Sequence, residues 1–151
     1  MGKLVDTLLK PEVRGPLVRD CVTMIDEEVS SKGGLSGMAI KAGYATVKAF
    51  KSGIVPESVE GMIDDMVKNL EPLWDEFEKG GSAGTLESYL SARSGQVADA
   101  LLKISDDRAA RTSHHNLKRV YEKLRPTGKK NVEQAVPRIA GVVGRHMRAS
   151  A

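Results

Sequence analysis

The sequence has a single cysteine, few aromatic residues and no long apolar run. Cys21 has no second cysteine to pair with, so an intramolecular disulfide framework and a multi-cysteine zinc site are excluded. A reducing, cytoplasmic setting is therefore expected. Charged or polar residues interrupt every apolar run before it reaches the roughly 18 residues of a membrane-spanning helix. We expect neither a transmembrane segment nor a signal peptide.

Sustained alternation of apolar and polar residues, typical of strands, is also absent. Apolar residues recur instead at intervals of three and four, which predicts an all-α domain. With aromatic residues at only 4%, aliphatic side chains and alanine must fill its core. We expect one bundle of about six to seven amphipathic helices spanning residues 1–151. The predicted helices cover residues 2–9, 11–29 or 16–29, 35–51, 56–78, 86–110, 113–124 and 130–147, with Pro72 and Pro137 expected to kink or restart theirs.

Helical periodicity also predicts which side chains turn inward. Cys21 lies on an apolar stripe and is expected to be a small core residue. Over residues 35–51 a face of mostly small residues is expected to pack closely against a neighbouring helix. That face comprises Leu35, Met38, Ala42, Ala45 or Thr46, Ala49 and Phe50. Over residues 113–124 the expected inner stripe is Leu117, Val120, Tyr121 and Leu124.

Charge is distributed unevenly along the chain. Residues 1–112 carry 14 basic and 18 acidic side chains, whereas residues 113–151 carry 9 basic and 2 acidic ones. The acidic residues concentrate over residues 57–78. Two explanations are open: the acidic helix and the basic C-terminal region lie together and neutralise each other, or the basic region contacts a polyanion or an acidic partner.

The most distinctive local pattern is a lysine face on the helix expected over residues 35–51. This face consists of Lys41, Tyr44, Lys48 and Lys51, which recur at helical spacing and so share one side of the helix. This face can be solvated surface, an anion or nucleic-acid contact, or a protein interface. With the basic C-terminal region it forms the candidate anion-binding set Lys41, Tyr44, Lys48, Lys51, Lys118, Arg119, Lys123, Lys129 and Lys130.

No constellation of residues predicts catalysis, a metal site or a cofactor. The glycines near residue 34 lack the spacing of a phosphate-binding loop and follow no strand. None of the three histidines is preceded by the glutamate of a bundle diiron motif. Residues 80–84 match the spelling Gly-x-Ser-x-Gly, but a nucleophile elbow needs a strand before it. We expect a protein that is not an enzyme.

Four segments carry a family resemblance: MGKLVDTLL at residues 1–9, SKGGLSG at 31–37, KAGY at 41–44 and KKNV at 129–132. The chain resembles, over essentially its whole length, an uncharacterised family of small bacterial all-helical proteins. The resemblance implies a bacterial, cytoplasmic origin and implies no activity, cofactor or site residue.

Three classes of function are compatible with these observations. The leading hypothesis is a non-enzymatic, cytoplasmic helical protein for interaction or scaffolding, with another protein or with itself. The alternative is polyanion binding, to nucleic acid or an anionic lipid surface, through the lysine face and the basic C-terminal region. The third is a small-molecule carrier or enzyme, with a bundle cavity expected at Met38, Met62, Met66 and Trp74.

Overall fold

The computed structural model of the chain describes residues 2–80 and 84–150. These residues form seven α-helices and no strand, which confirms the predicted all-α bundle. The helices are α1 (Lys3–Leu8), α2 (Pro11–Ser31), α3 (Gly34–Phe50), α4 (Ile54–Lys79), α5 (Leu86–Ser91), α6 (Ser94–Arg111) and α7 (His115–Ala149).

Prolines interrupt the helices less than expected. Pro126 and Pro137 both lie inside α7, so the two helices predicted over residues 113–124 and 130–147 are one, and the expected break between them is wrong. A proline inside a helix removes one backbone hydrogen bond and can bend the helix without ending it. Pro72 likewise lies within α4.

The single helix predicted over residues 86–110 is instead divided into α5 and α6. Thr85 caps α5, because its Oγ1 accepts a hydrogen bond from the backbone N–H of Ser88 at 3.1 Å. A turn at Ala92 and Arg93 then ends the short helix. This turn lets α5 and α6 pack against α7 in different directions.

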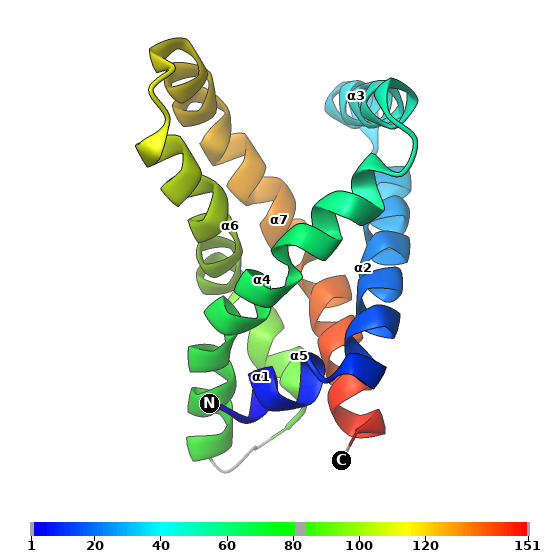
Figure 1. Cartoon of the computed structure of the whole chain (residues 1–151), viewed down its shortest axis with the longest axis vertical. Helices are drawn as coiled ribbons and strands as arrows, with labels where there is room; N and C mark the ends of the chain where they lie inside the picture. The colour runs from blue at the N-terminus through cyan, green and yellow to red at the C-terminus, as the bar shows by residue number, and fades with distance from the viewer. Residues whose placement is uncertain (1, 81–83, 151) are drawn as a thin grey trace.

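The helices give the molecule two unlike ends (Figure 1). α1, α5 and the last turns of α7 lie at the lower end, whereas α3 lies across the upper end beside the top of α2. The hairpin of α6 and α7 rises to the upper end on the other side. α7 packs against α6, α5 and α2, and α4 packs against α6, α1 and α2. α3 touches α2 and α4.

Five large apolar side chains are almost inaccessible to solvent. They are Leu4, Leu8, Leu17, Val97 and Val136. α1 is also fixed through its backbone: the Glu71 carboxylate of α4 accepts hydrogen bonds from the N–H groups of Leu4, at 3.1 Å, and Val5, at 2.8 Å. A helix N-terminus has unpaired N–H groups, and Glu71 satisfies two of them.

The basic C-terminal region is partly neutralised within the chain, but not by the acidic helix. On α7, Arg125 binds Asp106 of α6 at 2.8 Å and Arg138 binds Glu28 of α2 at 2.8 Å. Among the described residues α4 does not pack against α7 at all. The predicted pairing of acidic helix and basic region is therefore wrong, and the acidic residues of α4 find bases elsewhere, such as Arg14.

Candidate functional site

An apolar cavity separates α4 from α7. Its volume is about 580 Å³, within the roughly 300–1,000 Å³ typical of small-molecule sites. α2, α4, α6 and α7 provide most of its wall, and every lining residue is buried or half-buried. The lining residues are Leu8, Leu17, Cys21, Met24, Ile25, Glu28, Val29, Lys32, Ile40, Val59, Met62, Ile63, Met66, Val67, Leu70, Leu101, Leu102, Ile104, Ser105, Asn131, Val132, Ala135, Ile139, Val142 and Val143.

Two of the four side chains expected at a bundle cavity are found there. Met62 and Met66 of α4 line it, and their flexible thioether chains can adjust to ligands of different shape. Met38 is instead 66% exposed on α3. Trp74 is buried lower in α4, where its ring packs near Phe77 and its Nε1 donates a hydrogen bond to Glu78 at 2.8 Å. The prediction that Met38 and Trp74 line the cavity is therefore wrong.

Cys21 is partly buried against the core and lines the cavity wall. Burial in apolar surroundings, with a smaller contribution from the charge of Asp20, raises the pKa of its thiol to about 11. The thiol is therefore protonated at neutral pH and is a poor nucleophile.

The cavity adjoins a more polar space of about 970 Å³, here called the vestibule. The vestibule lies between the end of α2, the first turns of α3 and the middle of α7. Four residues line both spaces and so mark the boundary between them: Glu28, Lys32, Ile40 and Asn131.

A cluster of charged and amide groups lies at this boundary. Lys32 Nζ is 2.8 Å from Glu28 Oε1 and donates a second hydrogen bond to Gln134 Oε1 at 2.9 Å. Arg138 Nε donates to the other oxygen of Glu28 at 2.8 Å. The side chains of Lys32 and Glu28 are only 11% and 12% exposed. One carboxylate thus serves two cations in a partly desolvated position.

Basic side chains outnumber acidic ones in the vestibule wall. Lys32, Lys130 and Arg138 line it, against Glu28 as the single acid among the described lining residues. The sequence prediction missed all of these except Lys130. The spacing of Glu28 and Lys32 is a signal for a helical ion pair, but no local pattern connects either one with Arg138 on α7.

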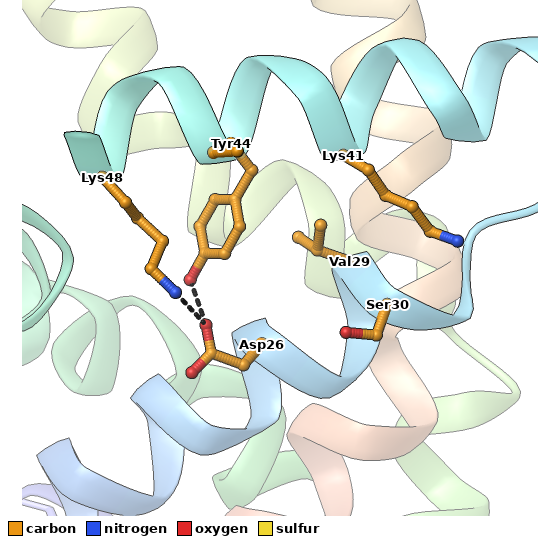
Figure 2. A pocket seen from close by; sticks show the side chains of 7 residues that line it. Asp26, Val29, Ser30, Lys41, Tyr44 and Lys48 are labelled. Atoms are coloured by element: carbon orange, nitrogen blue, oxygen red, sulfur yellow. Dashed lines mark hydrogen bonds and ion pairs between the residues drawn. The ribbon is translucent and has the colours of Figure 1, made fainter. Parts of the chain in front are cut away.

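The predicted lysine face lies on the side of α3 that faces α2 (Figure 2). The Tyr44 hydroxyl donates a hydrogen bond to Asp26 Oδ1 at 2.5 Å, and Lys48 Nζ lies 3.7 Å from the same oxygen. Burial and the hydrogen bond to Asp26 raise the pKa of Tyr44 to about 12. The Lys41 side chain points away from Asp26. These residues line a hollow of about 530 Å³ between α2 and α3.

The structure does not unite the nine candidate anion-binding residues on one surface. Lys51 pairs with Glu57 at 2.8 Å, and Lys129 pairs with Asp99 at 3.0 Å. The other members of the basic C-terminal region lie on the N-terminal half of α7, which belongs to the α6–α7 hairpin rather than to the α2–α3 side. They are Lys118, Arg119 and Lys123, with Lys130 further along in the vestibule wall. Polyanion binding stays a prediction.

α3 has the reverse of its expected orientation. Within α3, all of whose residues are described, Gly37 alone is buried. The small-residue face predicted to pack inward is exposed, and Leu35 and Phe50 at its two ends are each 86% exposed. The helix meets α2 through Gly37, where a Cβ would lie 2.6 Å from the carbonyl carbon of Lys32, so the two backbones approach as closely as only glycine allows.

The expected inner stripe at the start of α7 is largely outside as well. Tyr121 bonds to Ser105 at 2.9 Å and is half-buried, but Leu117, Val120 and Leu124 are exposed. By helical periodicity these three lie on the same face as Ala135, which lines the cavity. Thr127, Gly128 and Asn131 lie between them on this face, so the three exposed residues form a separate apolar patch at the upper end of the molecule.

The remaining site predictions concern metals, membranes and the Gly-x-Ser-x-Gly segment. Over residues 2–80 and 84–150, no three His, Cys, Asp or Glu side chains gather closely enough to hold a metal ion. No helix in the same part of the chain has both the length and the apolar character needed to cross a membrane. Residues 81–83 of the Gly-x-Ser-x-Gly segment lie outside the described residues.

Comparison with curated proteins and with solved structures finds no match. The family model described as "Family of unknown function (DUF6918)" matches residues 4–147, which is nearly the whole chain and includes every helix that lines the cavity. The resemblance to an uncharacterised family is confirmed, whereas the bacterial origin stays a prediction. The chain therefore belongs to this family of unknown function.

Proposed function

We propose that this protein is a non-enzymatic binding protein that holds a small apolar ligand in the cavity between α4 and α7. The observation that supports this proposal is the cavity itself: about 580 Å³ of space lined almost entirely by aliphatic side chains. A void of this kind costs stability when it is empty, because its lining loses dispersion contacts on one side. A bound apolar ligand restores those contacts.

The energetics favour an apolar occupant over water. Moving apolar surface out of water contributes about 25 cal/mol per Å². Water held in a cavity needs several polar partners, and polar side chains line this cavity mainly at the boundary with the vestibule, Ser105 excepted. Met62 and Met66 provide an adaptable part of the wall.

The proposal is tested by binding of Nile red, a neutral dye whose fluorescence rises in apolar surroundings. Ala135→Leu fills part of the cavity, so we expect dye affinity to fall by at least about tenfold, the equivalent of roughly 1.4 kcal/mol. Ala110→Leu is the matched control, because it adds the same atoms at an exposed position on α6 outside the cavity. Circular dichroism verifies that both variants keep their helices.

Unchanged dye affinity in Ala135→Leu would contradict the proposal, and so would the absence of dye binding in the wild-type protein. Native mass spectrometry of the protein purified from its own cells identifies a retained ligand by mass. The cytoplasmic setting belongs to this proposal too, since the lone thiol of Cys21 is compatible with reducing conditions.

A second function, association of two copies, is favoured by the outward face of α3. This face has large apolar residues at its ends, Leu35 and Phe50, and mainly alanines between them. In an antiparallel pair, Leu35 of one copy meets Phe50 of the other and the alanines allow close contact of the backbones. The face carries no charged side chain, so two identical copies do not repel each other there.

Sedimentation velocity over a range of concentrations tests this second function. Ala42→Glu lies mid-helix on the exposed face and places two like charges near the two-fold axis, so we expect the dimer to dissociate. Ser58→Glu, on the exposed side of α4, is the control and leaves association unchanged. A wild-type protein that is monomeric at every concentration would contradict this second function.

A further inference from the structure

We propose that the cavity ligand is a long-chain carboxylate whose headgroup is bound by Lys32 and Arg138 at the boundary with the vestibule. The inference rests on the proposed function and names the chemical class of its ligand. It starts from the adjacency of the two spaces, since Glu28, Lys32, Ile40 and Asn131 line both. A chain that enters the cavity from the vestibule leaves its head beside these residues.

The charges at that point are unbalanced. Glu28 accepts hydrogen bonds from Lys32 at 2.8 Å and from Arg138 at 2.8 Å, one on each carboxylate oxygen. The three groups together carry one excess positive charge. The Lys32 side chain is 11% exposed and that of Arg138 41%, so water screens the charge of Lys32 less than that of Arg138. A ligand with a single negative charge neutralises it.

Lys32 is also fixed in position. Its backbone ends α2 as the helix cap, and α3 crosses directly over it at Gly37. Its ammonium group is held between Glu28 and Gln134. A preorganised donor loses little conformational entropy when an anion binds. Asn131 adds an amide at the boundary, and Lys130 adds a further cation in the vestibule wall.

The shape of the space selects a single chain. The cavity of about 580 Å³ is the size of a drug-like ligand, which suits one alkyl chain better than the two chains of a phospholipid. The apolar lining accepts the chain, and the excess positive charge lies at one end of it. This polarity, apolar inside and cationic at the mouth, matches a fatty acid rather than an alkane or an alcohol.

The experiment compares hexadecanoate with hexadecanol as competitors of Nile red at pH 8, where a carboxylate with a pKa of about 4.3 is ionised. We expect the acid to bind at least about tenfold more tightly, the gain typical of a charge-assisted hydrogen bond. In Lys32→Met this preference disappears while affinity for the alcohol is retained. Lys41→Met, the same substitution on α3 outside the vestibule, keeps the preference.

Glu28→Gln provides a change in the opposite direction. Glu28 competes with the ligand for both cations, so its neutralisation is expected to raise affinity for the acid several-fold and to leave the alcohol unaffected. If Lys32→Met fails to fold, Arg138→Gln, on a more exposed side chain, makes the same test with a smaller loss of preference.

Two outcomes separate this inference from the proposed function. Equal affinity of the wild-type protein for acid and alcohol would overturn the carboxylate assignment and leave the apolar site intact. Absence of binding by both competitors would overturn the proposed function itself. Hexadecyl phosphate is a third competitor, and tighter binding of it than of the acid would reject the carboxylate in favour of a phosphate headgroup.

Discussion

The lower and upper ends of the molecule are built on different principles. At the lower end α1 is enclosed, with Leu4 and Leu8 almost inaccessible and its first turn bound to Glu71. At the upper end α3 buries only Gly37 of its described residues and exposes Leu35 and Phe50. The cavity lies between the two. We therefore expect the folding stability of the chain to be concentrated at the lower end.

The largest expected difference between the two ends is the loss of stability when a leucine is truncated to alanine. Leu4→Ala removes a side chain that is 1% exposed and is expected to lower the free energy of unfolding by about 2–5 kcal/mol. Leu35→Ala, at the upper end, is expected to change it by less than about 0.5 kcal/mol. Urea denaturation followed by circular dichroism measures both. Equal losses would show that stability is spread evenly.

Two glycines of α3 test the close contact between this helix and Lys32. A Cβ at Gly37 would lie 2.6 Å from the carbonyl carbon of Lys32, so Gly37→Ala forces the two backbones apart and is expected to cost about 1–3 kcal/mol. Gly43 has nothing within 4 Å, and Gly43→Ala is expected to stabilise the protein by about 0.5–1 kcal/mol through helix propensity. Thermal unfolding should show a lower melting temperature for Gly37→Ala and a higher one for Gly43→Ala. Shifts of the same sign would contradict the close contact at Gly37.

The backbone attachment of the lower end is tested at Glu71. Glu71→Gln removes the charge that accepts the N–H groups of Leu4 and Val5, and is expected to cost about 0.5–2 kcal/mol. Hydrogen exchange of these two amides should accelerate in parallel. Asp65→Asn, an exposed acid on the same helix, is the control and leaves both observables unchanged. Unaltered exchange in Glu71→Gln would show that α1 is held by its leucines alone.

The smallest expected effect is a pH dependence in the α6–α7 hairpin. Arg125 first, and Tyr121 second, lower the pKa of Asp106 below its ordinary 3.8. A lowered folded pKa means that Asp106 stabilises the fold above pH 3.8 and loses this contribution as the pH falls through the folded pKa. Because the groups are partly exposed, Asp106→Asn should cost less than about 1 kcal/mol at pH 7.

The same Asp106→Asn variant should unfold with wild-type stability at a pH below the folded pKa of Asp106. Urea titrations at pH 7 and at successively lower pH below 3.8 compare the two proteins, and the difference in their stability should shrink as the pH falls. A difference that persists unchanged in acid would rule out the ionised carboxylate as its source.

The sequence located most of the helical segments, but not all of their boundaries and not the orientation of their faces. Periodicity identifies the residues that share a helical face, and it correctly grouped Lys41, Tyr44 and Lys48. It does not specify which face turns inward. On α3 the neighbour is Asp26 of α2, so the polar face turns in and the alanine face turns out. The choice depends on a residue of another helix, which no local pattern contains.

The sequence predicted only part of the candidate site, for a related reason. Met62 and Met66 were predicted at a cavity because they are apolar and flexible, and this holds. Lys32 and Arg138 lie on different helices and meet only because both bind Glu28. Pro126, expected to separate two helices, instead lies inside α7, so one helix extends from the cavity wall to the upper end.

Cys21 gives the cavity a built-in chemical reporter. It is the only thiol in the chain, it lines the cavity wall, and its pKa of about 11 keeps it almost wholly protonated near pH 8. Alkylation by iodoacetamide is therefore slow and occurs at one position. A ligand that fills the cavity covers this thiol, so the rate of mass gain by the intact protein measures occupancy without any attached label.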